Sequence, residues 1–260
     1  NIQAAIKKQT TGSRIGNCIE VAIYTDFYTL QLLGNTAKTE EFVRLVFQDV
    51  ASVYALHDVS LRLSQVFIYT STDPYASLTN LGAIRDLFAN SVQNSYTGRL
   101  VHLLSLRPLG GGLANGVGGF CNSYPAYPGP QSIATNLSEP RIPFPDYSFN
   151  TYVVAHELGH VMGLRHTHAC IWNGTFVQID DCGNVVATLS GNTPEGDNCY
   201  IVNNPILPAS GGTIMSQCHQ LAGTGINLNL GFGVLPGQLL YENFVFSDCV
   251  TGAACGGFPP

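Results

Sequence analysis

Three histidines, a glutamate and a glycine lie in one short segment at spacings that suit a catalytic metal site. They are His156, Glu157, His160, Gly163 and His166, in the pattern H-E-x-x-H-x-x-G-x-x-H. Residues four apart share one face of a helix, so the rings of His156 and His160 can reach one zinc ion. Glu157 would project beside that ion, where a carboxylate can act as general base on zinc-bound water. Glycine tolerates positive φ, so Gly163 lets the chain leave the helix and return His166 as the third ligand.

The spacing leaves alternatives open. An ordinary solvated helix can carry histidines by coincidence, and His168 competes with His166 as third ligand, although the motif favours His166. His57 and His102 have no ligand spacing, so we expect ordinary core or surface roles for them.

The metal-site residues need a helix to position them, and the sequence predicts one. Apolar residues recur at helix-like offsets that form a buried stripe: Val153, Val154, Leu158, Val161 and Met162. Ser148 or Asn150 can cap the start of this helix.

Upstream, strand and helix patterns alternate. Strands are expected over 18–24, 61–69 and 100–106, with helices over 39–55 and 79–90. This order predicts an α/β (α+β) fold with a mostly parallel, twisted sheet covered by helices. The glycine-rich stretch 110–119 has neither the Lys-Ser/Thr pair of a phosphate-binding loop nor a following helix, so it predicts an edge strand. A further strand is expected over 131–137.

The amino-acid composition changes after His166. Residues 167–234 are rich in Gly, Asn, Asp and Pro, and a helix is expected over 236–246. We therefore expect one catalytic domain with two parts: a sheet-and-helix subdomain over 1–166, ending in the zinc-binding helix, and an irregular, disulfide-linked subdomain over 167–260.

Composition excludes several functions. Charged residues are only 11% of the 260, and the net charge is −6. The sequence has no cluster of basic residues of the kind that binds nucleic acid or an anionic membrane surface. No apolar run is long enough for a transmembrane helix. Without an initial Met or a signal-type apolar region, the sequence is expected to be a mature form, derived from a zymogen and cut from its targeting and propeptide segments.

The eight cysteines form no C-x-x-C pair, which favours disulfides in an oxidising, extracellular setting over a thiolate zinc site. Local spacing favours Cys182–Cys199 and Cys249–Cys255, with Cys170–Cys218 and Cys18–Cys121 as the remaining pairs.

A second motif, Gly-Gly-Thr-Ile-Met-Ser-Gln-Cys-His over 211–219, follows downstream. With the long histidine motif it resembles the metzincin zinc proteases, in which a Met-turn follows the zinc helix. The resemblance implies that Met215 packs beneath the three zinc-bound rings. The segments 166–170 (His-Thr-His-Ala-Cys) and 211–219 resemble most closely the adamalysin (reprolysin) group, especially secreted bacterial reprolysin-like peptidases.

Two positions depart from the pattern of related proteases. Animal adamalysins carry Asp after the third histidine, where this chain has Thr167. Astacins and serralysins place a metal-binding Tyr two residues after the methionine, where this chain has Gln217, so no tyrosine ligand is expected.

The resemblance implies a secreted, monomeric zinc endopeptidase that acts on proteins or peptides. It implies that the substrate lies along an edge strand within 109–117 and that residues after Met215 wall a pocket. The candidate substrate-binding residues are Gly111, Gly112, Leu113, Ala114 and His219. For His219 a structural role is the alternative, and the sequence favours it slightly over a role in the pocket.

Two other functions remain as alternatives: a zinc hydrolase of a non-peptide substrate, and a non-catalytic zinc-containing binding module. The intact Glu157 argues against the binding module, because zinc binding alone does not need that carboxylate. Asp180, Asp181 and Asp197 are candidate Ca²⁺ ligands, although an EF-hand spacing is absent.

Overall fold

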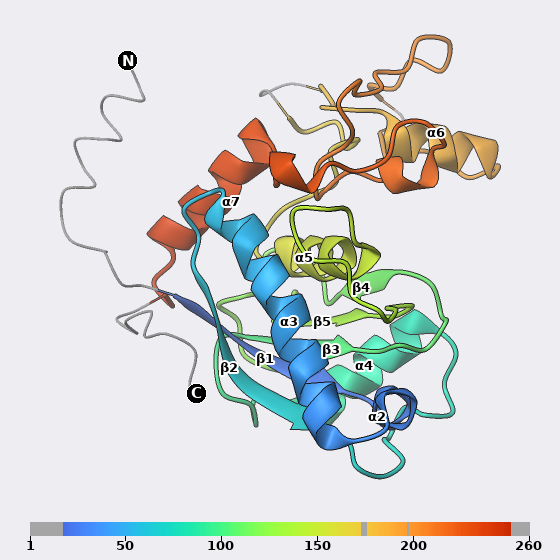
Figure 1. Cartoon of the computed structure of the whole chain (residues 1–260). Coiled ribbons are helices and arrows are strands. Elements are labelled where there is room, and N and C mark those ends of the chain that lie inside the picture. The colour runs from blue at the N-terminus through green and yellow to red at the C-terminus, as the bar shows by residue number, and fades with distance from the viewer. Residues whose placement is uncertain (1–17, 173–175, 197, 251–260) are drawn as a thin grey trace.

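The computed structural model describes residues 18–172, 176–196 and 198–250 (Figure 1). The elements are β1 (Ile19–Thr25), α2 (Phe27–Leu33), α3 (Thr36–Ala55), β2 (Leu61–Ile68), α4 (Leu81–Val92), β3 (Leu100–Leu104), β4 (Gly112–Ala114), β5 (Gln131–Ala134), α5 (Phe149–Val161), α6 (Cys182–Leu189) and α7 (Val234–Phe246). Short 3₁₀ turns occupy Cys218–Gln220 and Leu228–Leu230. No helix in these ranges has both the length and the apolar character needed to cross a membrane.

The strands form one twisted sheet in the order β2-β1-β3-β5-β4. Neighbouring strands are parallel except β4, which is antiparallel to β5 and lies at the edge. The predicted α/β (α+β) class and the mostly parallel sheet are therefore confirmed. The glycine-rich stretch does supply an edge strand, although only three of its residues belong to β4.

Helices cover both faces of the sheet, because alternate strand residues point to opposite sides. On one face Val21 of β1 belongs to a core that includes Phe47 of α3 and Leu158 of α5. On the other face Tyr24 packs edge-on against Phe88 of α4, with ring centroids 5.7 Å apart. Figure 1 shows α3 and α4 on opposite sides of the strands, with α5 beside β4 and β5.

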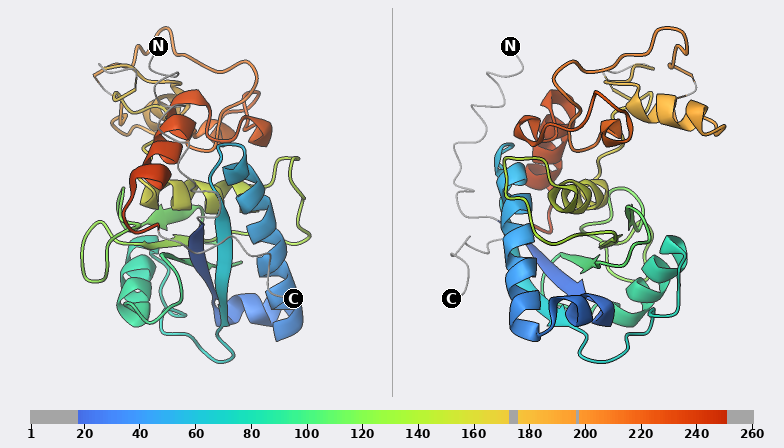
Figure 2. Two further views of the ribbon diagram at one scale, coloured as in Figure 1. Left: turned by 90° about the vertical axis from the view of Figure 1, so that its left-hand side faces the viewer. Right: turned by 45° about the vertical axis from the view of Figure 1, so that its right-hand side comes forward.

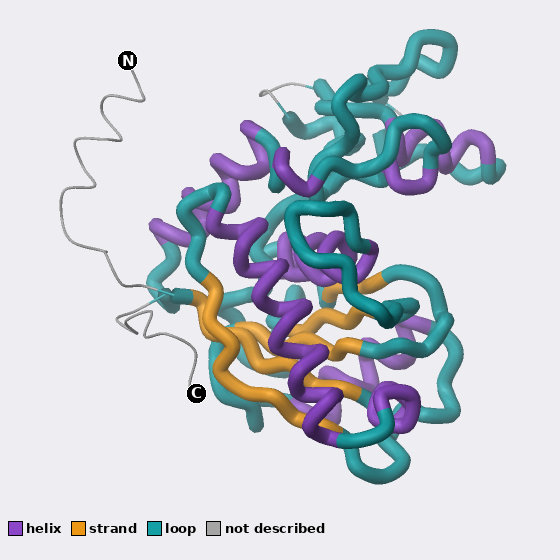
Figure 3. Tube along the Cα trace, in the orientation of Figure 1, coloured by secondary structure: helices purple, strands orange, loops and turns teal. Residues whose placement is uncertain are grey.

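After α5 the chain is mostly loop, as expected from its composition (Figure 3). Figure 2 shows these loops and α6 extending away from the sheet, with α7 returning toward α5. The amide Nδ2 of Asn243 in α7 donates to the carbonyl of Met162 at 2.8 Å, which attaches α7 to the end of α5. The boundary between two subdomains after His166 stays a prediction.

Three disulfides lie within the described residues, and none is a predicted pair. They join Cys121 to Cys249, Cys170 to Cys199, and Cys182 to Cys218, with Cα atoms 5.5, 5.7 and 4.9 Å apart. The predictions Cys182–Cys199, Cys170–Cys218, Cys249–Cys255 and Cys18–Cys121 are therefore wrong. A disulfide needs Cα atoms about 4.4–6.8 Å apart in space, and the paths of the irregular loops decide which cysteines meet.

Two short helices were not predicted. α2 spans seven residues, and its start depends on the Asp26 side chain, which accepts from Thr29 N at 2.9 Å. α6 spans eight residues within the irregular region. Helices of two turns give too little periodicity for a sequence pattern to reveal them.

Candidate metal centre

The centre is built on α5, a helix that is buried on nearly all sides. It ends at Val161, and two residues later Gly163, with a φ of +98°, turns the chain sharply. The amide of Leu164 donates to the carbonyl of Gly159 at 2.9 Å, which closes the last turn. The expectation that Gly163 adopts a positive φ and redirects the chain toward His166 is confirmed.

The rings of His156, His160 and His166 converge. One potential ligand atom from each lies within 4.8 Å of the others, and the Nε2 atoms of His160 and His166 are 3.1 Å apart. Two nitrogens that bind one zinc at about 2.0–2.1 Å in a tetrahedral site are separated by a similar distance. The trio that the motif predicts is thus the trio that the fold brings together.

Each of these rings has its other nitrogen engaged. The Nδ1 atom of His156 lies 2.7 Å from the Ile214 carbonyl, and that of His160 lies 2.8 Å from the Leu164 carbonyl. The Nδ1 atom of His166 lies 2.6 Å from Oε2 of Glu195. Carbonyl and carboxylate oxygens only accept, so every Nδ1 is the protonated donor and every Nε2 carries a lone pair.

Three converging Nε2 lone pairs repel one another unless a cation lies between them, so the donor set fits a divalent metal. Burial, followed by the neighbouring His166, lowers the pKa of His160 to about 3. Burial, followed by the neighbouring His160, lowers the pKa of His156 well below its usual value. Both rings therefore stay neutral at neutral pH, which is the form that binds metal.

Glu157 lies beside the trio under the edge strand. Its residue is 6% exposed, and burial raises its pKa to about 8, against a hydrogen bond from the Ala114 backbone. A Cβ added at Gly112 would lie 2.5 Å from Cγ of Glu157, so β4 passes directly over this side chain. A cation on the neighbouring rings would lower the pKa of Glu157 again, because opposite charge favours the carboxylate.

A cavity of about 370 Å³ opens in front of these groups. The candidate substrate-binding residues all line it, namely Gly111, Gly112, Leu113, Ala114 and His219. Phe149, Tyr152 and Gln217 form further parts of its wall.

His219 belongs to an aromatic stack in this wall. Its ring centroid is 4.6 Å from that of Tyr152, which in turn is 5.5 Å from that of His156. The Tyr152 hydroxyl donates to the Ser216 carbonyl at 2.7 Å. Burial lowers the pKa of His219, and its Nδ1 has no hydrogen-bond partner among the described residues.

The second motif packs against the first. Met215 is fully buried, and a Cβ added at Gly159 would lie 2.8 Å from its Sδ. Thr167, the residue after the third histidine, donates its backbone N–H to the Met215 carbonyl at 3.1 Å. This hydrogen bond connects the loop that carries His166 to the turn that carries Met215.

His168 does not join the trio. Its ring stacks on that of His166 at 4.7 Å, and its Nε2 lies 3.2 Å from Oε2 of Glu195. Sequence reasoning missed Glu195, because it lies 29 residues beyond His166 in an irregular segment without periodicity. Burial raises the pKa of Glu195, but hydrogen bonds from His166 and His168 outweigh it and bring the pKa below its usual value.

The remaining candidates have structural partners. His57 Nε2 accepts from the Phe232 amide at 2.8 Å, and His102 Nδ1 lies 2.8 Å from the Ser132 hydroxyl, in agreement with the core roles expected for both.

The acidic candidates for calcium are also engaged. Asp180 accepts from Cys182 N at 3.0 Å and Asp181 from Ile206 N at 2.7 Å. Asp197 lies outside the described residues, and a calcium site stays a prediction of the sequence.

A protein-family model agrees with the geometry of the site. The family model Reprolysin_5, described as metallo-peptidase family M12, matches residues 17–228. A search of curated proteins found no match. A solved structure described as a chaperone–substrate complex shares 15% identity, with a TM-score of 0.46 over 89% of this chain and 34% of that one. The chain therefore spans about a third of that solved protein. Since the family model covers most of the 260 residues, the chain belongs to the reprolysin-like metallopeptidases of family M12.

Proposed function

We propose that this protein is a secreted zinc-dependent endopeptidase of the metzincin type. The observation that carries the proposal is the convergence of three imidazole Nε2 lone pairs beside a buried carboxylate, at the wall of an open cavity. Family membership supports a metallopeptidase, and the chemistry of the donor set supports zinc.

His156, His160 and His166 would hold the metal. When bound, zinc supplies a Lewis acid that lowers the pKa of coordinated water toward about 7 and polarises a carbonyl. The backbone acceptors Ile214 and Leu164 keep the first two rings in the tautomer that presents Nε2.

Glu157 is the proposed general base. It accepts the proton of the water molecule that attacks the scissile carbonyl and then passes that proton to the leaving amine nitrogen. Its burial keeps bulk water from competing for the proton, and the Ala114 N–H holds the carboxylate beneath β4.

The proposed substrate is an extended peptide. β4 has β5 as its sheet neighbour on one side, so its other edge can pair with an added strand. The aromatic wall formed by Phe149, Tyr152 and His219 would receive a side chain of that peptide. An edge strand with one sheet neighbour beside the carboxylate favours a peptide over a non-peptide substrate, because a peptide offers matching backbone groups.

The extracellular location is part of the same proposal. Three disulfides within the described residues are typical of proteins that fold in an oxidising compartment. Outside the cell these disulfides would stay oxidised and keep the loops ordered, whereas the reducing cytosol would break them.

A casein digestion compares wild type, wild type with a zinc chelator, and Glu157→Gln. We expect wild type to cleave, chelation to abolish cleavage with recovery on added zinc, and Glu157→Gln to bind zinc but lose at least about a hundredfold in rate. The exposed Glu41→Gln on α3 is the matched control and should cleave normally. Zinc binding without cleavage by wild type would favour a binding module, and activity of Glu157→Gln would refute the assigned base.

A further inference from the structure

The third histidine of the trio is supported differently from the other two. His156 and His160 donate their Nδ1–H groups to backbone carbonyls, whereas His166 donates to the carboxylate of Glu195 at 2.6 Å. The same oxygen, Oε2, receives a second contact from Nε2 of His168 at 3.2 Å. The side chain of Glu195 is 38% exposed and outside the hydrophobic core, yet it is aimed at two stacked imidazoles.

His166 has more need of such support than its partners. His156 and His160 project from α5, whose backbone hydrogen bonds fix their direction. His166 lies on the loop after Gly163, where no helix constrains its ring. A loop residue keeps its orientation only through contacts made from elsewhere in the chain.

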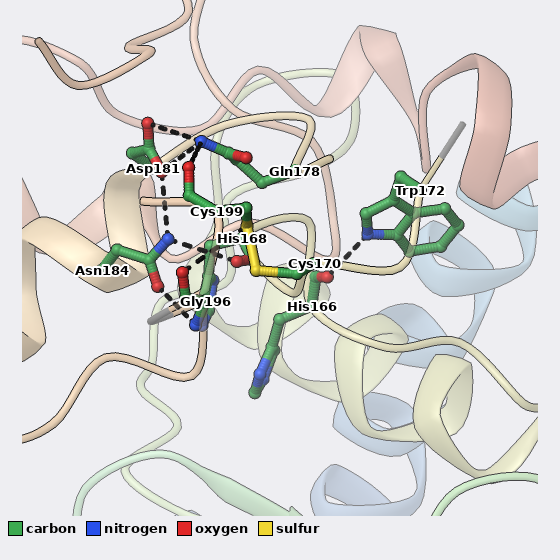
Figure 4. The surroundings of a disulfide bond; sticks show 9 residues. All are labelled: His166, His168, Cys170, Trp172, Gln178, Asp181, Asn184, Gly196 and Cys199. Atoms are coloured by element: carbon green, nitrogen blue, oxygen red, sulfur yellow. Dashed lines mark hydrogen bonds between the residues drawn. A yellow bond between two sulfur atoms is a disulfide. The ribbon is translucent and has the colours of Figure 1, made fainter. Parts of the chain in front are cut away.

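The loop that carries Glu195 is itself fastened to the loop that carries His166. Figure 4 shows Asn184 between them: its Nδ2 donates to the His168 carbonyl at 3.2 Å and its Oδ1 accepts from Gly196 N at 3.0 Å. The disulfide Cys170–Cys199 joins the same two loops covalently.

The two linked loops leave no room for a side chain at Gly196, the residue next to Glu195. A Cβ added at Gly196 would lie 2.3 Å from the His168 carbonyl and 2.5 Å from Nδ2 of Asn184. The backbone after Glu195 therefore packs directly on the 166–170 segment, and its carboxylate stays within reach of His166. Trp172 adds a contact on the same segment, with Nε1 donating to the His166 carbonyl at 2.9 Å.

We propose that Glu195 is the positioning residue of the metal centre, which holds the His166 ring in its Nε2-presenting tautomer and strengthens it as a metal ligand. The inference rests on the proposed zinc site and extends it to a residue that the histidine motif does not contain. A carboxylate acceptor makes a stronger hydrogen bond than a carbonyl and raises the basicity of the ring it holds. His168 supplies the second donor that keeps the carboxylate in place.

The test measures zinc affinity directly, by competition with a chromogenic chelator, on wild type, Glu195→Gln, Glu195→Asp and the control Glu41→Gln. Removal of an outer-sphere partner of a ligand weakens metal binding by about 10- to 100-fold. We expect that loss for Glu195→Gln, a smaller loss for Glu195→Asp, which keeps the charge on a shorter side chain, and none for Glu41→Gln.

A second measurement separates positioning from a purely structural role. The urea midpoint of the metal-free protein should be the same for wild type and Glu195→Gln, because the side chain is partly exposed and leaves the core unchanged. Unchanged zinc affinity in Glu195→Gln would overturn the inference, as would a loss explained by a lower midpoint of the metal-free variant. The failure of wild type to bind zinc would instead reject the proposed function itself.

Discussion

His156 and Ile214 are joined by a hydrogen bond of 2.7 Å across 58 residues of sequence. The carbonyl of Ile214 precedes Met215, so the same turn that orients the first ligand also places the buried methionine under α5. The two motifs in the sequence are therefore one structural unit, and a substitution in one motif should disturb the packing of the other.

Gly159→Ala tests this unit. An alanine in a helix interior is normally more stable than glycine by about 1 kcal/mol. Here the added Cβ would lie 2.8 Å from Sδ of Met215 and 3.0 Å from Cε1 of Phe232. We expect a net loss of about 1–3 kcal/mol in the free energy of unfolding, measured by urea denaturation.

Gly82→Ala in α4 is the control for this change, since the nearest atom to its added Cβ, Oδ1 of Asn80, lies at 3.1 Å. It should lower the free energy of unfolding less than Gly159→Ala does, because its one close contact is with a side-chain oxygen that can shift by a few tenths of an ångström. Equal effects of the two substitutions would contradict the packing of Met215 against α5.

Gly112→Ala tests the placement of the proposed base. The new Cβ would lie 2.5 Å from Cγ of Glu157 and 2.8 Å from the Ile133 carbonyl, so either the carboxylate or β4 must move. A displacement of about 1 Å in a catalytic group can cost about a hundredfold in rate. We expect kcat to fall by that order while bound zinc stays stoichiometric, as measured by peptide cleavage and metal analysis.

A drop in zinc content parallel to the drop in rate would show that Gly112 supports the ligands rather than Glu157. The Gly82→Ala variant again serves as the reference and should retain full activity.

Cys170→Ser/Cys199→Ser removes the disulfide that fastens the Glu195 loop. We expect it to weaken zinc binding to a degree similar to Glu195→Gln, and combining the changes should add little, because both act through His166. Chelator competition on the single and combined variants measures this coupling.

Cys121→Ser/Cys249→Ser is the matched control, since that disulfide holds the segment after α7. Both removals should lower stability by about 2–4 kcal/mol, but the control should leave zinc affinity intact. If the losses of zinc affinity in the Cys170–Cys199 and Glu195 variants were fully additive, the two changes would not act through the same residue, His166.

His102 should make stability depend on pH. Complete burial lowers its pKa to about 3, below the unfolded value of about 6.5, so between these values the unfolded chain binds a proton that the folded chain does not. Stability should then fall as pH drops through this window, by about 1.4 kcal/mol per pH unit from this group.

The measurement compares urea unfolding of metal-free wild type and His102→Leu from pH 6.5 to 4. The free energy of unfolding of the variant should depend on pH with a slope that is lower by that amount. Its stability at pH 7 can also change, because the contact with Ser132 is lost. Parallel slopes would show that His102 does not resist protonation in the fold.

Local patterns in the sequence were sufficient for much of the scaffold. The alternation of strands and helices predicted the parallel sheet, and the glycine-rich stretch predicted its edge strand. Gly163 predicted the sharp turn after α5. Each of these depends on residues close in sequence, whose spacing along a helix or strand fixes their relative direction.

The sequence by itself determined which residues stand at metal-binding intervals, because the helical repeat sets the distance between His156 and His160. Only the tertiary structure decided which acceptor holds each ring, which cysteines pair, and that Glu195 meets His166. Those contacts join segments tens of residues apart through irregular loops. No periodic pattern records such a meeting, because the packing of the whole chain, and not the spacing of neighbours, brings the two side chains together.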